Sequence, residues 1–319
     1  VDKQLHALKA EDGSEVWARP LGHWVWGEAL VQDGYVYAGS LDGRIHALQV
    51  SDGTLRWESE KLEGAVRAGP VLLGDQLIVG TDSHTTTYGA LGAFATGIGA
   101  TEMAAVWATG EIWLKVPETM RIHLRGKLPA HVWSKDVILH IIGSLGSDGA
   151  DYKCVEFVGD TVSRMSIASR MVLSNMSIEM GAKAGICYPD RKTQDWLSTR
   201  TTRKVEMDTS CQTGKADEEL EMDVEELEPQ VACPHTVDNV VPVGKVEGTR
   251  IDQAVLGSCT NGRLEDLAAA EAVLRGNKIS EDVRFIVVPA SREIYIEAAE
   301  KGLLSSLARS GAVIVNPGC

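Results

Sequence analysis

Three consecutive polar side chains, Asp82, Ser83 and His84, lie just after the apolar run "LIVG" and precede three threonines. A carboxylate beside an imidazole holds the ring in one tautomer, which suits proton transfer or the orientation of a ligand. The segment that follows has glycines at 89, 92, 97 and 99, which allow close backbone approach to a ligand or a neighbouring helix. A polar turn that leads into a helix would use the same residue types, so both interpretations stay open.

A second candidate pair is Asn175 and Glu179 in "MVLSNMSIEMGAKAG" (171–185). The two side chains are four residues apart, so on a helix they share one face, with Ser174 close by. Glu179 stands among methionine and isoleucine, where a carboxylate is costly to bury unless it is paired or used. A helix with one solvated acid explains the pattern equally well.

Two cysteines, Cys259 in "LGSCTNGR" and Cys319 in "VNPGC", each follow an apolar run and lie in a loop of small residues. Small neighbours leave room for a bulky group against a thiolate, as at an iron–sulfur cluster. Cys259 alone could equally be a nucleophile or a core residue. The six cysteines are scattered in a chain too large to need disulfides, which favours a reducing compartment. They include no CxxC pair, so spacing alone nominates no metal site.

Helices and buried strands alternate after residue 82, and these elements must position the candidate residues. Apolar side chains at helical spacing predict helices over 100–114, 136–146 and 263–276. Strand-to-loop units are predicted in "IDQAVLGSCTNG", "VRFIVVPAS" and "GAVIVNPGC". The alternation indicates an α/β fold with a largely parallel sheet that is covered on both faces. Ligands of such folds bind at the loops that follow the strands, where "GSCTNG", "PASR" and "NPGC" lie.

The first 80 residues have a different pattern, with two repeats, 5–18 and 45–58, at a period of forty residues. Both repeats contain His-Ala-Leu, then Asp-Gly, then Trp: His6, Asp12, Gly13 and Trp17 correspond to His46, Asp52, Gly53 and Trp57. Short β-rich runs alternate with Asp-Gly turns, in which glycine supplies the positive φ of a tight turn. The units resemble blades of quinoprotein-type β-propellers, which implies two propeller-type blades over residues 1–80. Two blades cannot close a ring, so this segment is expected to be a fragment.

The formal net charge of -14 argues against a nucleic-acid surface, which needs clustered lysine and arginine. The composition, 44% hydrophobic and 24% charged, is that of a soluble globular protein, and no apolar run is long enough to span a membrane. Much of the acidity lies in "ADEELEMDVEELEP" (216–229), which we interpret as a solvated loop or helix face. We therefore expect neither nucleic acid nor a membrane as a partner.

Residues 80–319 resemble the aconitase superfamily, and within it the large subunits of the 3-isopropylmalate dehydratase and homoaconitase group. The resemblance is carried, in family order, by "GTDSHTTTYGALGAFATGIGATEMAAV", "WLKVPETMRI", "LSNMSIEMGAKAG", "EPQVACPHTVDNVVPV", "GSCTNGRLEDL" and "VNPGC". It implies aconitase-like parallel-sheet domains over 81–319. It also implies reversible dehydration and hydration of a hydroxy di- or tricarboxylic acid, such as 3-isopropylmalate or homocitrate in leucine or lysine biosynthesis. A 4Fe–4S cluster, a small swivel-domain subunit as partner and a cytoplasmic location are further implications of the resemblance.

The resemblance also assigns roles to matching positions. Three cysteines bind the cluster in this family, and Cys259 and Cys319 match the first two. By the same resemblance, Asp82 and His84 belong to the hydrogen-bonding network around the leaving hydroxyl, and Ser83 contacts the substrate. Asn175 lies at the cluster and substrate, and Glu179 is the group that handles the proton. Cys154, Cys187, Cys211 and Cys233 match no ligand motif and are interpreted as structural.

The sequence departs from the family pattern at both ends of the matching region. A third cluster cysteine would follow Cys319 in the family, and the family's first domain would replace the two N-terminal repeats. The string "GDQLIVGTD" (74–82) fits both a propeller strand and the approach to the dehydratase motif, so we expect a join there, accidental rather than selected. The chain is then expected to be an incomplete, inactive chimera. The alternative is a non-catalytic binding module in which the propeller-type repeats are the functional part.

Overall fold

The computed structural model describes residues 3–25, 29–32, 34–40, 44–58, 77–202 and 214–318. The chain divides into two compact units. The first contains residues 1–76 and 113–116, and the second contains residues 77–112 and 117–319. None of the helices within the described ranges combines the length and the hydropathy needed to cross a lipid bilayer.

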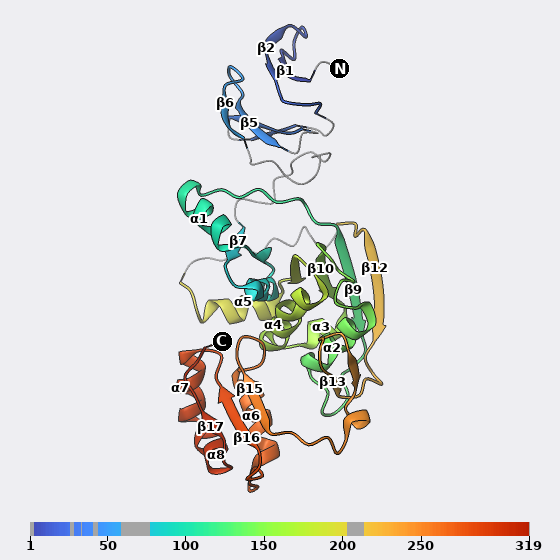
Figure 1. The fold of residues 1–319 in the computed structure, drawn as a ribbon, viewed down its shortest axis with the longest axis vertical. Coiled ribbons are helices and arrows are strands. Elements are labelled where there is room, and N and C mark those ends of the chain that lie inside the picture. Colours follow the sequence, from blue (N-terminus) through green and yellow to red (C-terminus); the bar gives the residue numbers. More distant parts are fainter. Residues whose placement is uncertain are drawn as a thin grey trace. The chain divides into compact units, whose positions relative to one another are not determined.

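The first unit consists of small antiparallel sheets (Figure 1). One sheet pairs β1 (Gln4–Leu8) with β2 (Glu15–Pro20), and the other has the order β3 (Leu30–Gln32), β4 (Tyr35–Gly39), β5 (Ile45–Gln49), β6 (Leu55–Glu58). The buried Trp17 donates a hydrogen bond from Nε1 to the carbonyl oxygen of Val50, at 2.7 Å. This bond links the two sheets through the tryptophan of the first repeat.

The predicted Asp-Gly turns of the first unit are confirmed. Gly13 and Gly53 have φ angles of 70° and 68°, a conformation that glycine adopts without steric cost. In each turn the aspartate side chain accepts a hydrogen bond from the backbone N–H two residues later, at 2.9 Å for Asp12 and 2.8 Å for Asp52. The repeats therefore share turn geometry, whereas their assignment as propeller blades stays a prediction.

The centre of the second unit is a four-stranded parallel sheet in the order β11-β10-β9-β12. Its strands are β9 (Thr119–Arg125), β10 (Cys154–Val158), β11 (Ala184–Cys187) and β12 (Glu218–Asp223). The helices around it are α2 (Ser134–Leu145), α3 (Asp160–Arg164), α4 (Ile167–Met176) and α5 (Arg191–Ser198). One hydrophobic cluster joins strands and helices and includes Ile122, Phe157, Ile138 and Leu173, each fully buried. The predicted parallel α/β sheet is confirmed for this part of the chain.

The acidic run 216–229 contains an edge strand, so the interpretation as a solvated loop or helix face was wrong. In β12, alternate side chains are exposed and partly buried, and Leu220 and Met222 pack against the central cluster. Two carboxylates of the strand, one on each face, meet basic side chains: Glu218 pairs with Lys153 at 2.5 Å, and Glu219 lies 3.4 Å from Arg121. The alternation of apolar and charged residues with a period of two therefore predicts the secondary structure of this segment better than its high charge does.

A short 3-10 helix, η1 (Ser83–Leu91), lies between β7 (Ile78–Gly80) and β8 (Ala95–Gly97), which pair in parallel. It packs against α4 and β11 so closely that a Cβ atom at Gly89 would overlap the carbonyl oxygen of Gly185. This contact explains one of the glycines in the glycine-rich segment. The following helix, α1 (Ala100–Thr109), is shorter than the predicted 100–114 because Gly110, at φ 73°, ends it.

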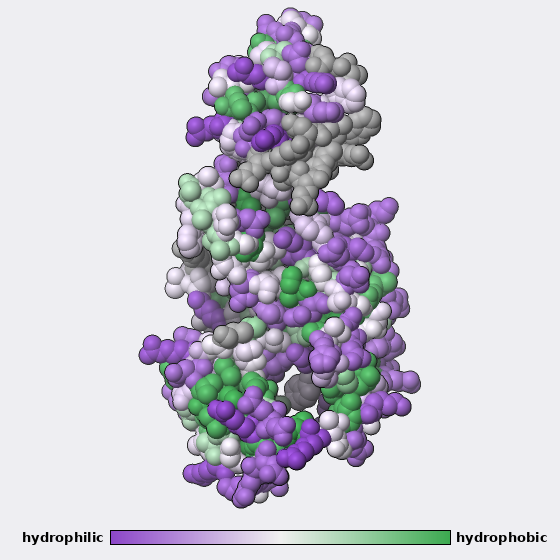
Figure 2. All heavy atoms as spheres, in the orientation of Figure 1, coloured by the Kyte–Doolittle hydropathy of each residue, from purple (hydrophilic) through white to green (hydrophobic). Residues whose placement is uncertain are grey.

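The C-terminal part of the second unit has a separate parallel sheet in the order β15 (Gln253–Gly257), β16 (Arg284–Val288), β17 (Val313–Ile314). Its helices are α6 (Leu264–Leu274), α7 (Arg292–Glu300) and α8 (Leu303–Arg309). The three helices contact one another and share a hydrophobic cluster with one face of the sheet. On the other face Val255 and Val313 are 59% and 45% exposed, and Figure 2 shows apolar residues gathered on this region. Among the described residues, the expected cover on both faces is therefore missing here.

Short elements connect the two sheets. They are the hairpin of β13 (Gln230–Ala232) and β14 (Val240–Pro242) and the 3-10 helix η4 (Val243–Val246), which lie between β12 and β15 in the chain. Another short element, η2 (Ser177–Met180), continues α4 and leads to β11. The hairpin packs against α2, and β14 passes over Gly143 of that helix. The hairpin and α2 thus form one wall of the cavity described next.

Candidate functional site

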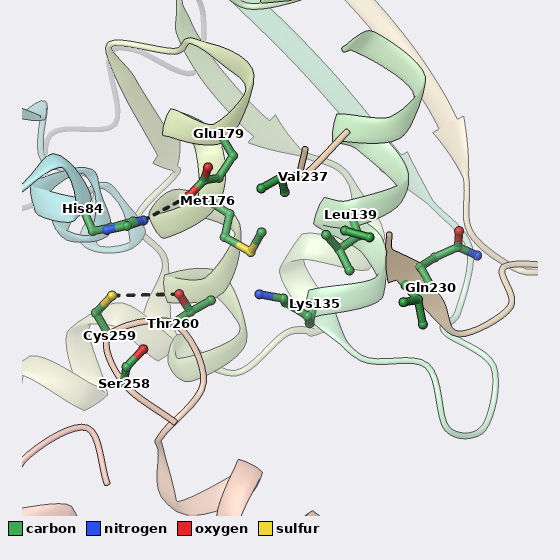
Figure 3. A pocket seen from close by; sticks show the side chains of 12 residues that line it. His84, Lys135, Leu139, Met176, Glu179, Gln230, Val237, Ser258, Cys259 and Thr260 are labelled. Carbon is green, nitrogen blue, oxygen red and sulfur yellow. Dashed lines mark hydrogen bonds and ion pairs between the residues drawn. The ribbon is translucent and has the colours of Figure 1, made fainter. Parts of the chain in front are cut away.

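A cavity of about 540 Å³ lies in the second unit, where η1, α2, α4, η2 and the β13–β14 hairpin meet the loop after β15 (Figure 3). Its ionisable lining residues are His84 from η1, Lys135 from α2, Glu179 from η2 and Cys259 from the loop. The apolar lining residues include Leu139, Met176 and Val237. Segments that are far apart in sequence thus supply an imidazole, an amine, a carboxylate and a thiol to one space.

His84 lies between two carboxylates. Its Nε2 atom is 3.3 Å from Oε1 of Glu179, and its Nδ1 atom is 3.6 Å from Oδ1 of Asp82. Asp82 also fixes the start of η1, because its Oδ1 atom accepts a hydrogen bond from the backbone N–H of His84 at 2.7 Å. The ring is therefore oriented from both sides, which suits exchange of a proton with the Glu179 carboxylate.

Backbone geometry and hydrogen bonds from Arg263 hold the Cys259 loop. Gly257 has a φ of 133° and Ser258 a φ of 67°, so the chain turns sharply after β15. Arg263 donates from Nη1 to the carbonyl oxygens of Cys259, at 3.1 Å, and Thr260, at 2.7 Å. Burial lowers the pKa of Arg263, an effect that the charge of Asp266 opposes. The loop thus presents the Cys259 side chain to the cavity from a fixed backbone.

Asn175 is fully buried behind the cavity, and its amide joins three elements. Its Nδ2 group donates to Oγ1 of Thr87 at 2.8 Å, and its Oδ1 atom accepts from Oγ1 of Thr260 at 2.7 Å. In addition, Thr86 donates from Oγ1 to the Asn175 carbonyl oxygen at 3.2 Å. Asn175 therefore positions η1, which carries His84, against the loop that carries Cys259.

Replacing this amide should loosen the loop. In Asn175→Ala the partly buried Thr260 hydroxyl loses its acceptor, so we expect the free energy of unfolding to fall by about 2 kcal/mol. The Cys259 thiol should also react faster with an alkylating reagent, followed by mass spectrometry of the peptide that contains it. Asn277 is exposed, and Asn277→Ala is the matched control. Equal alkylation rates in Asn175→Ala and the wild type would contradict the positioning role.

The predicted site residues fall into three groups. His84, Glu179 and Cys259 line the cavity together. Asp82 and Ser83 lie at the exposed start of η1, and Asn175 lies behind the cavity wall. Cys319 lies outside the described residues.

Lys135 was missed by the sequence interpretation. It stands next to Asp136 at the start of a helix, where an exposed lysine is common. Neither a hydrophobic period nor a sequence motif distinguishes it from other surface lysines. Asp136 itself has a capping role, because its Oδ2 atom accepts from the backbone N–H of Trp133 at 2.7 Å. Only the three-dimensional position of Lys135 on the cavity wall makes it a candidate.

The other described cysteines lie away from the cavity lining. Burial raises the pKa of both Cys154 and Cys187 to about 12, so their thiols stay protonated at neutral pH. Cys233, in the hairpin loop, is partly exposed, and Cys211 lies outside the described residues. Protonated core thiols are poor metal ligands, which agrees with the structural interpretation of Cys154 and Cys187.

The described side chains offer part of the donor set that an iron–sulfur cluster needs. Cys259 is a thiol rather than half of a disulfide, it is partly exposed, and small residues, Ser258 and Thr260, flank it at the cavity. Across the described ranges, no group of three or more His, Cys, Asp or Glu side chains is arranged to hold a metal ion. Cys259 therefore fits as one thiolate ligand, and the described residues supply no more of the ligand set than this.

The contact between the central part and the C-terminal part of this unit is largely polar. Ser166 and Ser169, at the start of α4, donate to the carboxylate of Glu265 at 2.8–3.0 Å. Thr260 binds Asn175 as described, and each part keeps its own hydrophobic cluster. The cavity thus lies beside an interface held by hydrogen bonds.

Comparison with known proteins relates this site to a family. The model of the aconitase family (aconitate hydratase) matches residues 45–249 and 243–319, so the match begins inside the second N-terminal repeat. A probable methanogen homoaconitase large subunit from Methanothermobacter thermautotrophicus is 56% identical over 256 residues, which are 80% of this chain and 58% of that protein. A probable 3-isopropylmalate dehydratase large subunit from the same organism is 55% identical over 251 residues, 79% of this chain and 60% of that protein.

A third relative gives the same result. The 3-isopropylmalate dehydratase large subunit 1 of Methanopyrus kandleri is 52% identical over 260 residues, 81% of this chain and 60% of that protein. The chain thus spans about 60% of the length of the curated relatives it matches. Because the family model covers most of the chain, including every described residue of the cavity, the chain belongs to the aconitase family.

Proposed function

We propose that this chain belongs to the large subunit of a hydro-lyase that reversibly dehydrates 3-isopropylmalate or a related hydroxy acid such as homocitrate, as in leucine or lysine biosynthesis. The observation that carries the proposal is the single cavity in which the His84–Glu179 pair and Cys259 meet. Relatives of both names match the chain almost equally, at 56% and 55% identity, so the proposal includes both substrates.

The proposed cofactor is a 4Fe–4S cluster, held by the thiolates of Cys259 and Cys319. When bound, such a cluster supplies a Lewis-acidic iron that favours loss of a hydroxyl group. The residues of the chain supply the remaining functions. Glu179 exchanges a proton with the substrate, and His84, oriented by Asp82, holds and passes that proton.

Two further proposed roles concern substrate contact. Ser83, at the start of η1, would contact substrate from the side of Asp82 and His84. Asn175 would act at the cluster and substrate through Thr260, because its amide is already bonded to that hydroxyl. A small swivel-domain subunit is the proposed protein partner, in line with the "large subunit" names of the relatives, and the cytoplasm is the proposed location.

For the N-terminal region we propose two propeller-type blades over residues 1–80, followed by the aconitase-like region over 81–319. Support for the blades comes from the shared geometry of the Asp12-Gly13 and Asp52-Gly53 turns and from the antiparallel pairing of all described strands up to Glu58. Expression of residues 1–80 alone tests this assignment. A segment that folds and unfolds cooperatively would support it, and an unfolded segment would contradict it.

Cluster assembly tests the proposed cofactor. The purified chain is incubated anaerobically with ferrous iron and sulfide, and bound iron, acid-labile sulfide and visible absorption are measured. We expect iron and sulfide binding in the wild type that is largely lost in Cys259→Ser. The matched control is Cys233→Ser, which removes another partly exposed thiol and should leave binding unchanged.

Two outcomes would contradict the proposed cofactor: equal iron content in the wild type and Cys259→Ser, or no bound sulfide in any of the three proteins. Turnover is tested separately, by adding the small subunit of a methanogen dehydratase to the reconstituted chain. Loss of water from 3-isopropylmalate or homocitrate is then followed through the ultraviolet absorption of the unsaturated product.

A further inference from the structure

Lys135 extends into the cavity from the first turn of α2. The side chain is half-buried and lines the same space as His84, Glu179 and Cys259. Figure 3 shows its amine reaching from α2 towards the side where Met176 and Thr260 lie. The charged end of this lysine is thus directed at the cavity rather than at the outer surface.

Among the described residues, no side chain or backbone group pairs with this amine. Within the described part of the chain, Lys135 Nζ has neither a hydrogen-bond partner nor a carboxylate within 4.0 Å. The neighbouring Asp136 is engaged elsewhere, because its two oxygens accept backbone N–H groups of Trp133, at 2.7 Å, and Gln230, at 2.8 Å. Glu179, the carboxylate of the cavity, is in contact with His84.

A half-buried ammonium group without a partner costs stability, and such groups cluster at binding and catalytic sites. Burial lowers the pKa of Lys135, and the negative charges of Glu179 and Cys259 act in the opposite direction. An anion in the cavity would restore the lost solvation and favour the charged amine. The unpaired amine of Lys135 therefore favours the binding of an anionic ligand in this cavity.

We propose that Lys135 binds a carboxylate group of the substrate. The apolar side chains of Leu139, Met176 and Val237 line the same cavity and would receive an alkyl group next to that carboxylate. The inference rests on the proposed function, which makes the ligand a hydroxy dicarboxylic acid. It adds a binding residue on α2, across the cavity from the His84–Glu179 pair.

The test uses 2-isopropylsuccinate, a dicarboxylate that has the alkyl branch but lacks the hydroxyl group and cannot react. Its affinity for the full chain without iron is measured by calorimetry or by NMR titration. We expect Lys135→Gln to weaken binding about 10- to 100-fold, the loss of one hydrogen bond to a charged group. Lys135→Arg keeps the charge and should retain most of the affinity. Lys245→Gln, which removes an exposed lysine outside the cavity lining, should leave the affinity unchanged.

A second measurement separates binding from a structural role. Because the amine has no partner in the described structure, Lys135→Met should unfold at the same urea concentration as the wild type or at a higher one. A lysine that held the fold together would give the opposite sign. Stability retained together with weakened binding is therefore the combination expected for a ligand-binding group.

Two results would overturn the proposal. One is equal affinity of Lys135→Gln and the wild type for 2-isopropylsuccinate, and the other is no binding by the wild type. Neither result bears on the Cys259-dependent binding of iron and sulfide, which tests the proposed function without this ligand. Failure of Lys135 as a carboxylate-binding residue and failure of the proposed function are thus distinguishable.

Discussion

Gly89→Ala is expected to lower the free energy of unfolding of the second unit by about 3 kcal/mol or more, because the new Cβ atom would overlap a backbone carbonyl. That carbonyl belongs to Gly185 in β11, and the next nearest atoms also belong to the backbone. A flexible side chain could rotate away from such an overlap, but a strand of the central sheet cannot. Either η1 or β11 must shift, and η1 carries His84.

The measurement is urea unfolding of the wild type and the variant, with a matched glycine as control. Gly244 lies in η4, its φ is not positive, and an added Cβ there would meet nothing within 4 Å. Gly244→Ala should be neutral or stabilising by about 0.4–1 kcal/mol, since alanine restricts the unfolded chain. If Gly89→Ala unfolds at the same urea concentration as Gly244→Ala, the close approach of η1 to β11 is wrong.

Asp190→Asn should cost about 3 kcal/mol, because it leaves a buried guanidinium group without its counter-ion. Arg170, on α4, is 1% exposed, and its Nη2 group donates to Oδ2 of Asp190 at 2.5 Å. Asparagine still caps the start of α5, where Asp190 accepts from the backbone N–H of Thr193, so the change isolates the charge. The double variant Arg170→Met, Asp190→Asn removes the stranded charge and should return to within about 1 kcal/mol of the wild type.

The double-mutant cycle is measured by urea unfolding at neutral pH. Simple addition of the two single effects, without recovery in the double variant, would refute the predicted coupling. Burial raises the pKa of Asp190, but the hydrogen bonds from Arg170 and Thr193 outweigh this effect, so the pKa lies below its ordinary value. The stabilisation by the pair is therefore complete above the ordinary aspartate pKa and is lost as the pH falls through the lowered value.

The sequence predicted the parallel α/β architecture because strands and helices of the second unit have clear periods. It predicted the helix over 263–276 to within two residues, since α6 spans Leu264–Leu274 with Arg263 and Arg275 as its caps. It did not predict the edge strand β12, because we interpreted the acidic residues as a solvated loop or helix face and overlooked the alternation of side chains with a period of two. A polar turn that leads into a helix was one of the two interpretations of the segment around His84, whereas this segment forms a 3-10 helix that contacts α4 and β11.

For the candidate site, the residue types in the sequence motifs predicted which side chains lie together, but not which neighbours hold them in place. The motifs singled out His84, Glu179 and Cys259, which the fold brings to one cavity. Their distances depend on Asn175, whose linking role cannot be read from sequence because its partners are 85 and 88 residues away. Lys135 was overlooked for a related reason: a missing partner is a property of the folded chain, not of the residue.

The polar interface between the two parallel sheets has a thermodynamic consequence. Opening this interface would break the hydrogen bonds of Ser166, Ser169 and Thr260 while both hydrophobic clusters stay intact. Little apolar surface would become hydrated, so the opening should have a small heat-capacity change and a small dependence on urea concentration. Amide hydrogens next to the cavity would then exchange through a low-energy opening that is distinct from global unfolding. The free energy of this opening should therefore change less with cold or with mild denaturant than the free energy of unfolding of either sheet.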